Sequence, residues 1–115
     1  MAAPTKAFPR RGVALEAPTK HGVYVITGRS GTVVNVGRTH RGRNGLLQRL
    51  TNHLRAQSSF VLRYLGADGN RLRDGFKFQC LEVRNPRKRA LLEYFATGKL
   101  CPKHLGVGLK SFSGE

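Results

Sequence analysis

Residues 21–38 read HGVYVITGRSGTVVNVGR, and this stretch carries the clearest structural signal in the chain. Two runs within it, Gly22–Thr27 and Thr32–Gly37, are rich in the β-branched and aromatic residues that strands favour. Between them lies Gly28–Gly31, a short turn with glycine at both ends. The stretch therefore predicts a β-hairpin.

The register of this hairpin is expected to follow from its turn. If Thr27 and Thr32 close the loop, Tyr24 lies opposite Asn35 on the neighbouring strand. Both side chains then share one face of the sheet, because side chains alternate along a strand. The plainest role for Tyr24 is a half-buried residue whose hydroxyl reaches the surface, and a catalytic phenol is the alternative.

Further along the chain, hydrophobic periodicity and capping residues predict four more elements. These are a leucine-striped helix over residues 46–57, a short helix over 60–65 capped by Ser58 or Ser59, a strand over 76–83 and a helix over 86–98. The last helix is expected to bury Leu91, Leu92 and Phe95. The order β-β-α-α-β-α predicts a small α+β domain, in which helices flank a mainly antiparallel, three-stranded sheet.

The length of 115 residues fits one domain with terminal extensions. Residues 1–20 hold three of the five prolines and little periodicity, so a flexible basic arm is expected there. The folded domain is expected over residues 21–98. Residues 99–115 are expected to form an extension that packs on the domain or trails from it.

Charge is the strongest signal in the composition. Lys and Arg number 21 against six Asp and Glu, which gives a formal net charge of +15. Such an excess favours a polyanionic partner, above all nucleic acid. No apolar stretch is long enough to span a membrane and no signal peptide is evident, so we expect a cytoplasmic protein without a membrane partner. No obligatory protein partner is evident.

The two cysteines, Cys80 and Cys101, are too far apart for a CxxC motif and too few for a metal cluster. One disulfide is conceivable, but two reduced thiols are the expectation for a cytoplasmic protein.

The six carboxylates limit the chemistry that this chain can perform. Four of them lie near the termini or in a turn-rich loop, namely Glu16, Asp68, Asp74 and Glu115. Only Glu82 and Glu93 remain, at the end of a strand and within a helix. The chain therefore has few carboxylates for a glycosidase that uses a pair of them or for phosphodiester cleavage with two metal ions. A single carboxylate that holds one Mg²⁺ remains compatible with this inventory.

Three polar side chains on the predicted helices are candidates for a site. Arg49 and His53 are i, i+4 neighbours at the border of the leucine stripe, where they can project into a groove. The ordinary alternative is a solvated arginine beside a surface histidine. Glu93 falls on the polar side of its helix, and its ordinary role is a surface ion pair with Arg89.

Taken in order, these features resemble the GIY-YIG nuclease superfamily over about residues 21–98. Ten residues separate the two tripeptides, as the family pattern requires. The matching features are Gly22-Val23-Tyr24, Asn35-Val36-Gly37, Arg49 with His53 on the following helix, and Glu93 on the helix after the third strand.

The resemblance implies hydrolysis of a DNA phosphodiester with one divalent ion. Glu93 would bind Mg²⁺ or Mn²⁺, and Arg49 would stabilise charge on the pentacoordinate phosphate. Tyr24 would act as the general base that activates water, and His53 would relay a proton or hold the phosphate. The resemblance does not distinguish single-stranded from double-stranded DNA as the substrate.

The second tripeptide begins with Asn35, where the family usually has tyrosine. An amide cannot take a proton from water, so the role of base would fall on Tyr24 alone. Gly37 and Arg38 would lie beside the catalytic groups or at the phosphate. The basic side chains expected to contact nucleic acid are Arg38, Arg41, Arg43 and Arg55.

Two other functions remain open. The first is a non-catalytic nucleic-acid-binding protein, such as a degenerate nuclease, that uses the same basic surface. The second is a ribosomal-type RNA binder, although no RNA-binding motif is recognisable. The nuclease is the preferred interpretation, because a module that only binds phosphate does not need a glutamate that repels it.

Overall fold

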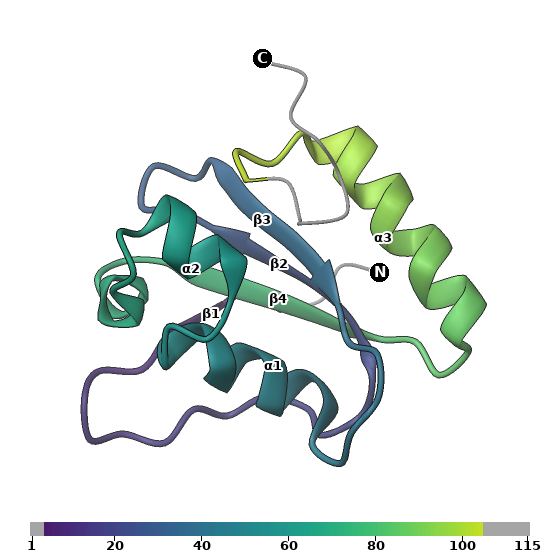
Figure 1. The fold of residues 1–115 in the computed structure, drawn as a ribbon, viewed down its shortest axis with the longest axis horizontal. Coiled ribbons are helices and arrows are strands. Elements are labelled where there is room, and N and C mark those ends of the chain that lie inside the picture. The colour runs from purple at the N-terminus through teal and green to yellow at the C-terminus, as the bar shows by residue number, and fades with distance from the viewer. Residues whose placement is uncertain (1–3, 105–115) are drawn as a thin grey trace.

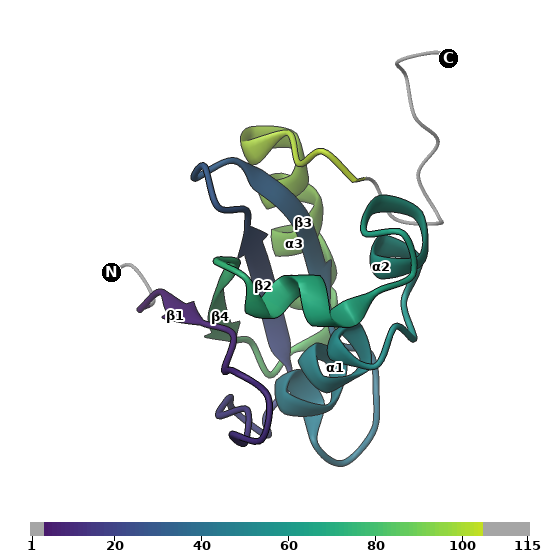
Figure 2. The ribbon, with the colours of Figure 1, turned by 90° about the vertical axis from the view of Figure 1, so that its left-hand side faces the viewer.

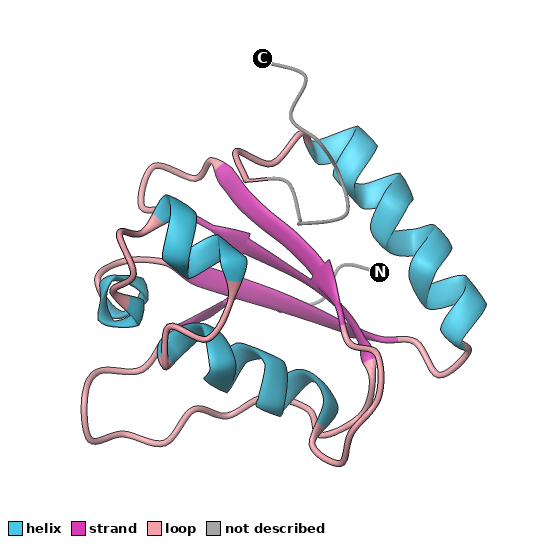
Figure 3. Ribbon diagram, in the orientation of Figure 1, coloured by secondary structure: helices cyan, strands magenta, loops and turns pink. Residues whose placement is uncertain are grey.

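The computed structural model describes residues 4–104, which form one four-stranded sheet with helices on both faces (Figures 1 and 3). The elements are β1 (Lys6–Ala7), β2 (Gly22–Thr27), β3 (Val33–Arg38), α1 (Gly45–Leu54), α2 (Ser59–Tyr64), the 3-10 helix η1 (Gly69–Arg73), β4 (Lys77–Glu82) and α3 (Pro86–Leu100). The strands lie in the order β1-β4-β2-β3, and every pairing is antiparallel. The expected α+β class with an antiparallel sheet is confirmed.

The fourth strand, β1, comes from the segment that was expected to be a flexible arm. It pairs with β4, and the next residue, Phe8, is buried with its ring centroid 4.9 Å from that of Phe78. Leu15 and Ala17 also pack against the core. Residues 4–20 therefore do not form the expected arm. Isolated apolar residues attach this segment to the domain, and such residues carry no periodic signal.

The two faces of the sheet have different coverings. Tyr24 and Ile26 of β2 point to the face that α1 and α2 cover, where the main hydrophobic core lies. Val23 and Val36 are also buried but point to the opposite face, because side chains alternate along a strand. The long helix α3 packs against β3 and β2 on that side (Figure 2).

The hairpin has a different register from the expected one. Tyr24 pairs with Gly37, and Ile26 pairs with Asn35. Thr27 pairs with Val33, and the irregularity beside Ile26 shifts the register at the turn. From Val23 to Ile26 the shift is two residues, so these side chains and their partners keep their expected faces, whereas Val33 moves to the other face beside Thr27. Tyr24 and Asn35 therefore still share one side of the sheet, although they do not lie opposite one another.

The helices begin near the expected residues and end at different ones. α1 ends at Leu54, before Ala56 adopts a left-handed backbone with φ of 59°. Ser58 caps α2, and its side chain accepts a hydrogen bond from the Val61 N–H. α3 continues past Gly98 to Leu100, because Cys101 rather than the glycine adopts the left-handed conformation that ends the helix.

The apolar stripe expected on α3 is wrong. Leu91 and Phe95 are 56% and 67% exposed, and Leu92 is only partly buried. The buried residue of this helix is Arg89, whose guanidinium donates to the backbone carbonyls of Val83 and His40. These two hydrogen bonds satisfy the guanidinium, so a charged side chain can be buried on the face of α3 that meets the sheet.

The segment after α3 joins the edge of the sheet. The backbone N–H groups of Lys103 and His104 donate to the carbonyls of Val33 and Val34. The beginning of the expected C-terminal extension therefore packs on the domain, whereas residues 105–115 lie outside the described residues. Among residues 4–104, no helix has the length and apolar character needed to cross a membrane.

Both cysteines are free, as expected. Cys101 is exposed at the end of α3, and Cys80 is partly buried on β4. Burial raises the pKa of the Cys80 thiol to about 11, so this thiol is protonated and unreactive at neutral pH.

Replacement of Phe8 tests whether the N-terminal segment contributes to stability. Phe8→Ala removes a buried ring, so we expect the free energy of unfolding to fall by about 3 kcal/mol in urea denaturation. Val13→Ala, at a residue that is 47% exposed, is the control and should change it by less than about 0.5 kcal/mol. Equal stability of the two variants would mean that the segment is detached in solution.

Candidate active site

The hydroxyl of Tyr24 lies at the centre of a buried polar cluster. It is 2.8 Å from Nε2 of His53, and Nε of Arg49 donates to it over 3.2 Å. Tyr24 is 1% exposed and His53 is fully buried. The alternatives of a tyrosine hydroxyl that reaches the surface and of a surface histidine are therefore wrong. The i, i+4 spacing on α1 therefore places both Arg49 and His53 on the phenol that β2 supplies.

Gly37 explains how the phenol fits between the strands and α1. It pairs with Tyr24 across the hairpin, and a Cβ atom at this position would lie 2.3 Å from the Tyr24 hydroxyl oxygen. Such a distance is far inside van der Waals contact. Glycine is therefore required at the end of the second tripeptide so that the ring can lie across β3.

His53 is held from its other side by Ser58. Nδ1 of the imidazole is 2.7 Å from Oγ of Ser58, the residue that caps α2. Burial, with the nearby charges of Arg49 and His104, lowers the pKa of His53 to about 3. The imidazole is therefore neutral at physiological pH. Sequence analysis identified Ser58 only as a helix cap, because a capping serine and one that also holds a ring have the same local pattern.

The pKa of Tyr24 is raised above its ordinary value, and burial of the phenol is the main cause. The negative charge of Glu93 raises it further. The positive charge and hydrogen bond of Arg49 lower it, as does hydrogen bonding with Asn35. Asn35 is itself buried, so it belongs to the surroundings of the phenol.

Glu93 approaches the cluster from α3 and forms an ion pair with Arg38 of β3. The expected surface pair of Glu93 with Arg89 is wrong, because Arg89 is buried and donates to backbone carbonyls. The Arg38 guanidinium also lies over the ring of Tyr94, 5.4 Å from its centroid. Glu93 is therefore held at the end of β3 by the residue that follows the second tripeptide.

The predicted site residues lie on two sides of the sheet near the end of β3. Tyr24, Arg49 and His53 are in contact on one face, whereas Glu93 pairs with Arg38 on the other. In Figure 1 the C-terminal end of β3 lies between α1 and α3. The negative charge of Glu93 raises the pKa of Tyr24, which couples the two sides electrostatically.

Among the described residues, the Glu93 carboxylate could bind one hard divalent ion but could not hold a cluster of metal ions. Glu93 supplies a carboxylate that is 21% exposed. Among residues 4–104 there is no group of three or more His, Cys, Asp or Glu side chains that could hold a metal. Mg²⁺ is commonly bound through one or two carboxylates plus substrate phosphates, so a lone glutamate is a sufficient protein ligand.

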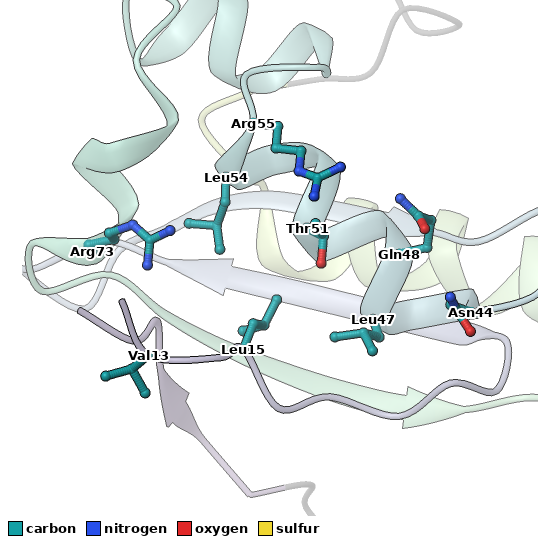
Figure 4. Close-up of a pocket in the computed structure, with 9 residues that line it drawn as sticks. All are labelled: Val13, Leu15, Asn44, Leu47, Gln48, Thr51, Leu54, Arg55 and Arg73. Carbon is teal, nitrogen blue, oxygen red and sulfur yellow. The ribbon is translucent and has the colours of Figure 1, made fainter. Parts of the chain in front are cut away.

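The other three arginines that were expected to contact nucleic acid are exposed, but they lie in two different places. Arg41 and Arg43 are in the loop between β3 and α1, close in sequence to Arg38. Arg55 follows α1 and lines a surface groove of about 320 Å³ with Arg73 and the segment around Val13 (Figure 4). None of the four predicted catalytic residues lines this groove. The geometry thus brings Arg38 to the site and leaves Arg55 apart from it.

Three solved structures resemble the chain over most of its length. All are of the GIY-YIG N-terminal endonuclease domain of UvrC from Thermotoga maritima, one bound to its catalytic divalent cation magnesium and two of point mutants bound to the catalytic cation. Each is 25% identical with a TM-score of 0.56, and the similarity covers 78% of this chain and 87–88% of that domain. The chain has a GIY-YIG-like fold.

This GIY-YIG-like fold supports a nuclease-type function. Neither a family profile nor a curated protein matches the chain. The likeness therefore rests on tertiary structure and on the few residues of the motif.

The buried, neutral His53 predicts a loss of stability in acid. The unfolded chain takes up a proton near pH 6.5, whereas folded His53 stays neutral to about pH 3. Since the unfolded state binds more protons in that interval, stability falls as pH falls. From this residue we expect about 1.4 kcal/mol less stability at pH 5.5 than at pH 7.5.

Urea denaturation at the two pH values measures this difference. His53→Gln keeps a polar side chain of similar reach and removes the titrating ring, so its stability should vary less between pH 7.5 and 5.5. The same pH dependence in the wild type and the variant would contradict the assignment.

Proposed function

We propose that this protein is a divalent-metal-dependent DNA endonuclease that hydrolyses phosphodiester bonds. The observation that supports the proposal is the contact of Tyr24 with Arg49 and His53, with Glu93 paired to Arg38 on the other face of the sheet, within a GIY-YIG-like fold. A phenol, a guanidinium and a carboxylate together supply a base, a cation for the phosphate and a ligand for a metal.

Arg49 is proposed to stabilise the charge that develops on the phosphate. Its Nε is engaged with Tyr24, while the side chain as a whole is only partly buried. The terminal N–H groups of the guanidinium can then donate to a phosphate oxygen. A fixed cation in a partly dry site stabilises an anionic transition state better than mobile water does.

Tyr24 is proposed as the general base. Its raised pKa keeps the phenol protonated in the resting protein, so the active form is a minor, deprotonated one. Hydrogen bonds from Arg49 and Asn35 stabilise the phenolate when it forms. His53, which is neutral and held by Ser58, orients the phenol without carrying charge.

Glu93 is proposed as the protein ligand of one Mg²⁺ or Mn²⁺ ion. A divalent cation held there would supply positive charge to neutralise the phosphate oxygens. Arg38, with the exposed Arg41 and Arg43 in the following loop, is proposed to bind the nucleic-acid backbone, and Arg55 to extend this contact. The net charge of +15 supports such a partner, because phosphate contacts supply most non-specific affinity.

A non-catalytic nucleic-acid-binding protein is the second candidate. The observation that favours it is the ion pair between Arg38 and Glu93, which occupies the proposed metal ligand. Asn35 also favours this candidate, because it stands where the family usually has a tyrosine. The two candidates differ in one measurable property, since only the nuclease cleaves DNA.

Cleavage assays with single-stranded, duplex and branched DNA test the proposal. We expect the wild type to cut at least one substrate with Mg²⁺ or Mn²⁺ and none in EDTA. Glu93→Gln and Arg49→Gln should each lower the rate at least about a hundredfold, as loss of a transition-state contact does, while DNA binding persists.

Matched controls for these variants are Glu82→Gln and Arg71→Gln, which make the same chemical changes at exposed residues. Both should retain cleavage within a few-fold. Activity of Glu93→Gln equal to that of Glu82→Gln would reject the assigned role, and DNA binding without cleavage of any substrate would favour the second candidate.

The assignment of Tyr24 as base predicts a pH dependence of the rate. Because burial raises its pKa above the ordinary value of about 10, the deprotonated fraction grows about tenfold per pH unit below that value. The cleavage rate should therefore rise with a slope close to one in log units between pH 7 and 9. Tyr24→Phe should abolish cleavage, and a flat profile in the wild type would exclude a tyrosine base.

A further inference from the structure

Arg38 has two partners, and both lie on α3. Its guanidinium forms an ion pair with Glu93 and lies 5.4 Å from the centroid of the Tyr94 ring. The side chains of Arg38 and Glu93 are only 20% and 21% exposed, so solvent screens the pair less than it screens a surface pair.

Positive charge exceeds negative charge around Glu93. The electrostatic surroundings of His40, on the loop after β3, include Arg38, Arg49 and Arg89 but one carboxylate, Glu93. A divalent cation that approaches Glu93 therefore meets repulsion from several guanidinium groups. It also meets a carboxylate that already has a cationic partner.

We propose that Arg38 is an exchangeable counter-ion that couples metal binding to nucleic-acid binding. Without nucleic acid, Arg38 neutralises Glu93 and keeps its affinity for a divalent ion low. A backbone phosphate draws the guanidinium to itself, because arginine binds phosphate through two parallel hydrogen bonds. Glu93 is then free to bind the metal, and the phosphate cancels part of the surrounding positive charge. This proposal rests on the proposed role of Glu93 as metal ligand.

The contact with Tyr94 can hold the Arg38 guanidinium while its anionic partner changes. Its ring is 55% exposed, so it lies at the surface where a nucleic acid would arrive. A cation–π contact has no requirement for the Glu93 carboxylate, and Arg38 can turn from Glu93 to a phosphate while it remains over the ring. Arginine is suited to both contacts, whereas lysine lacks the planar group.

Calorimetric titration with Mn²⁺ tests this exchange without reference to cleavage. The wild type should bind Mn²⁺ weakly alone and roughly tenfold more tightly with a phosphorothioate DNA hairpin that has a single-stranded tail. Titration of the hairpin with the Glu93→Gln protein corrects for ions that bind the DNA itself. By linkage, fluorescence anisotropy should detect the same increase in DNA affinity when Mn²⁺ is added.

Arg38→Gln is the decisive variant, and Arg41→Gln is its matched control because it removes the same charge from an exposed neighbouring residue. Without DNA, Arg38→Gln should bind Mn²⁺ roughly tenfold more tightly than Arg41→Gln, and DNA should add less to its affinity. Urea denaturation establishes that both variants are folded.

The outcomes separate this proposal from the proposed function. If Glu93→Gln binds Mn²⁺ as the wild type does, Glu93 is not the ligand and both proposals fail. If Glu93→Gln loses Mn²⁺ but Arg38→Gln gains no more affinity than Arg41→Gln, the exchange is wrong and the nuclease proposal stands.

Discussion

The hydroxyl of Tyr24 connects the sheet to α1, and the geometry of the candidate site depends on this contact. A buried phenol needs hydrogen-bond partners, and His53 and Arg49 supply them from consecutive turns of one helix. The ring reaches these partners because Gly37 has no side chain. Ser58 extends the connection to α2. One polar cluster thus holds the phenol, the guanidinium and two helices together.

The second constraint is electrostatic. A net charge of +15 suits a polyanionic partner, but it leaves Glu93 as a lone carboxylate among guanidinium groups. Arg38 offsets the cost of placing that carboxylate in a partly buried position. In the proposed nuclease, the substrate phosphate would pair with Arg38, and the metal ion would bind Glu93. The ion pair that favours a non-catalytic binding protein would then be broken when nucleic acid binds.

The sequence predicts the hairpin, the short α1 and α2 helices and the antiparallel α+β class, because periodicity and capping are local signals. It also identifies Tyr24, Arg49, His53 and Glu93 as candidates through their spacing. The structure joins the first three by hydrogen bonds and places Glu93 across the sheet, paired with Arg38. It predicts neither the burial of Phe8 nor the exposure of most of the apolar residues on α3. Both depend on which surface meets the sheet, and no local pattern encodes that.

The charge, the order of the elements from β2 to α3 and the residue types available for chemistry can be read from the chain alone, since they follow from composition and local patterns. The strand β1, the hairpin register, the second role of Ser58 and the pairing of Arg38 with Glu93 appear only in the folded molecule. These contacts join residues from different elements across the sheet. Their partners are chosen by packing and by the need to satisfy buried polar groups, which act only once the chain has folded.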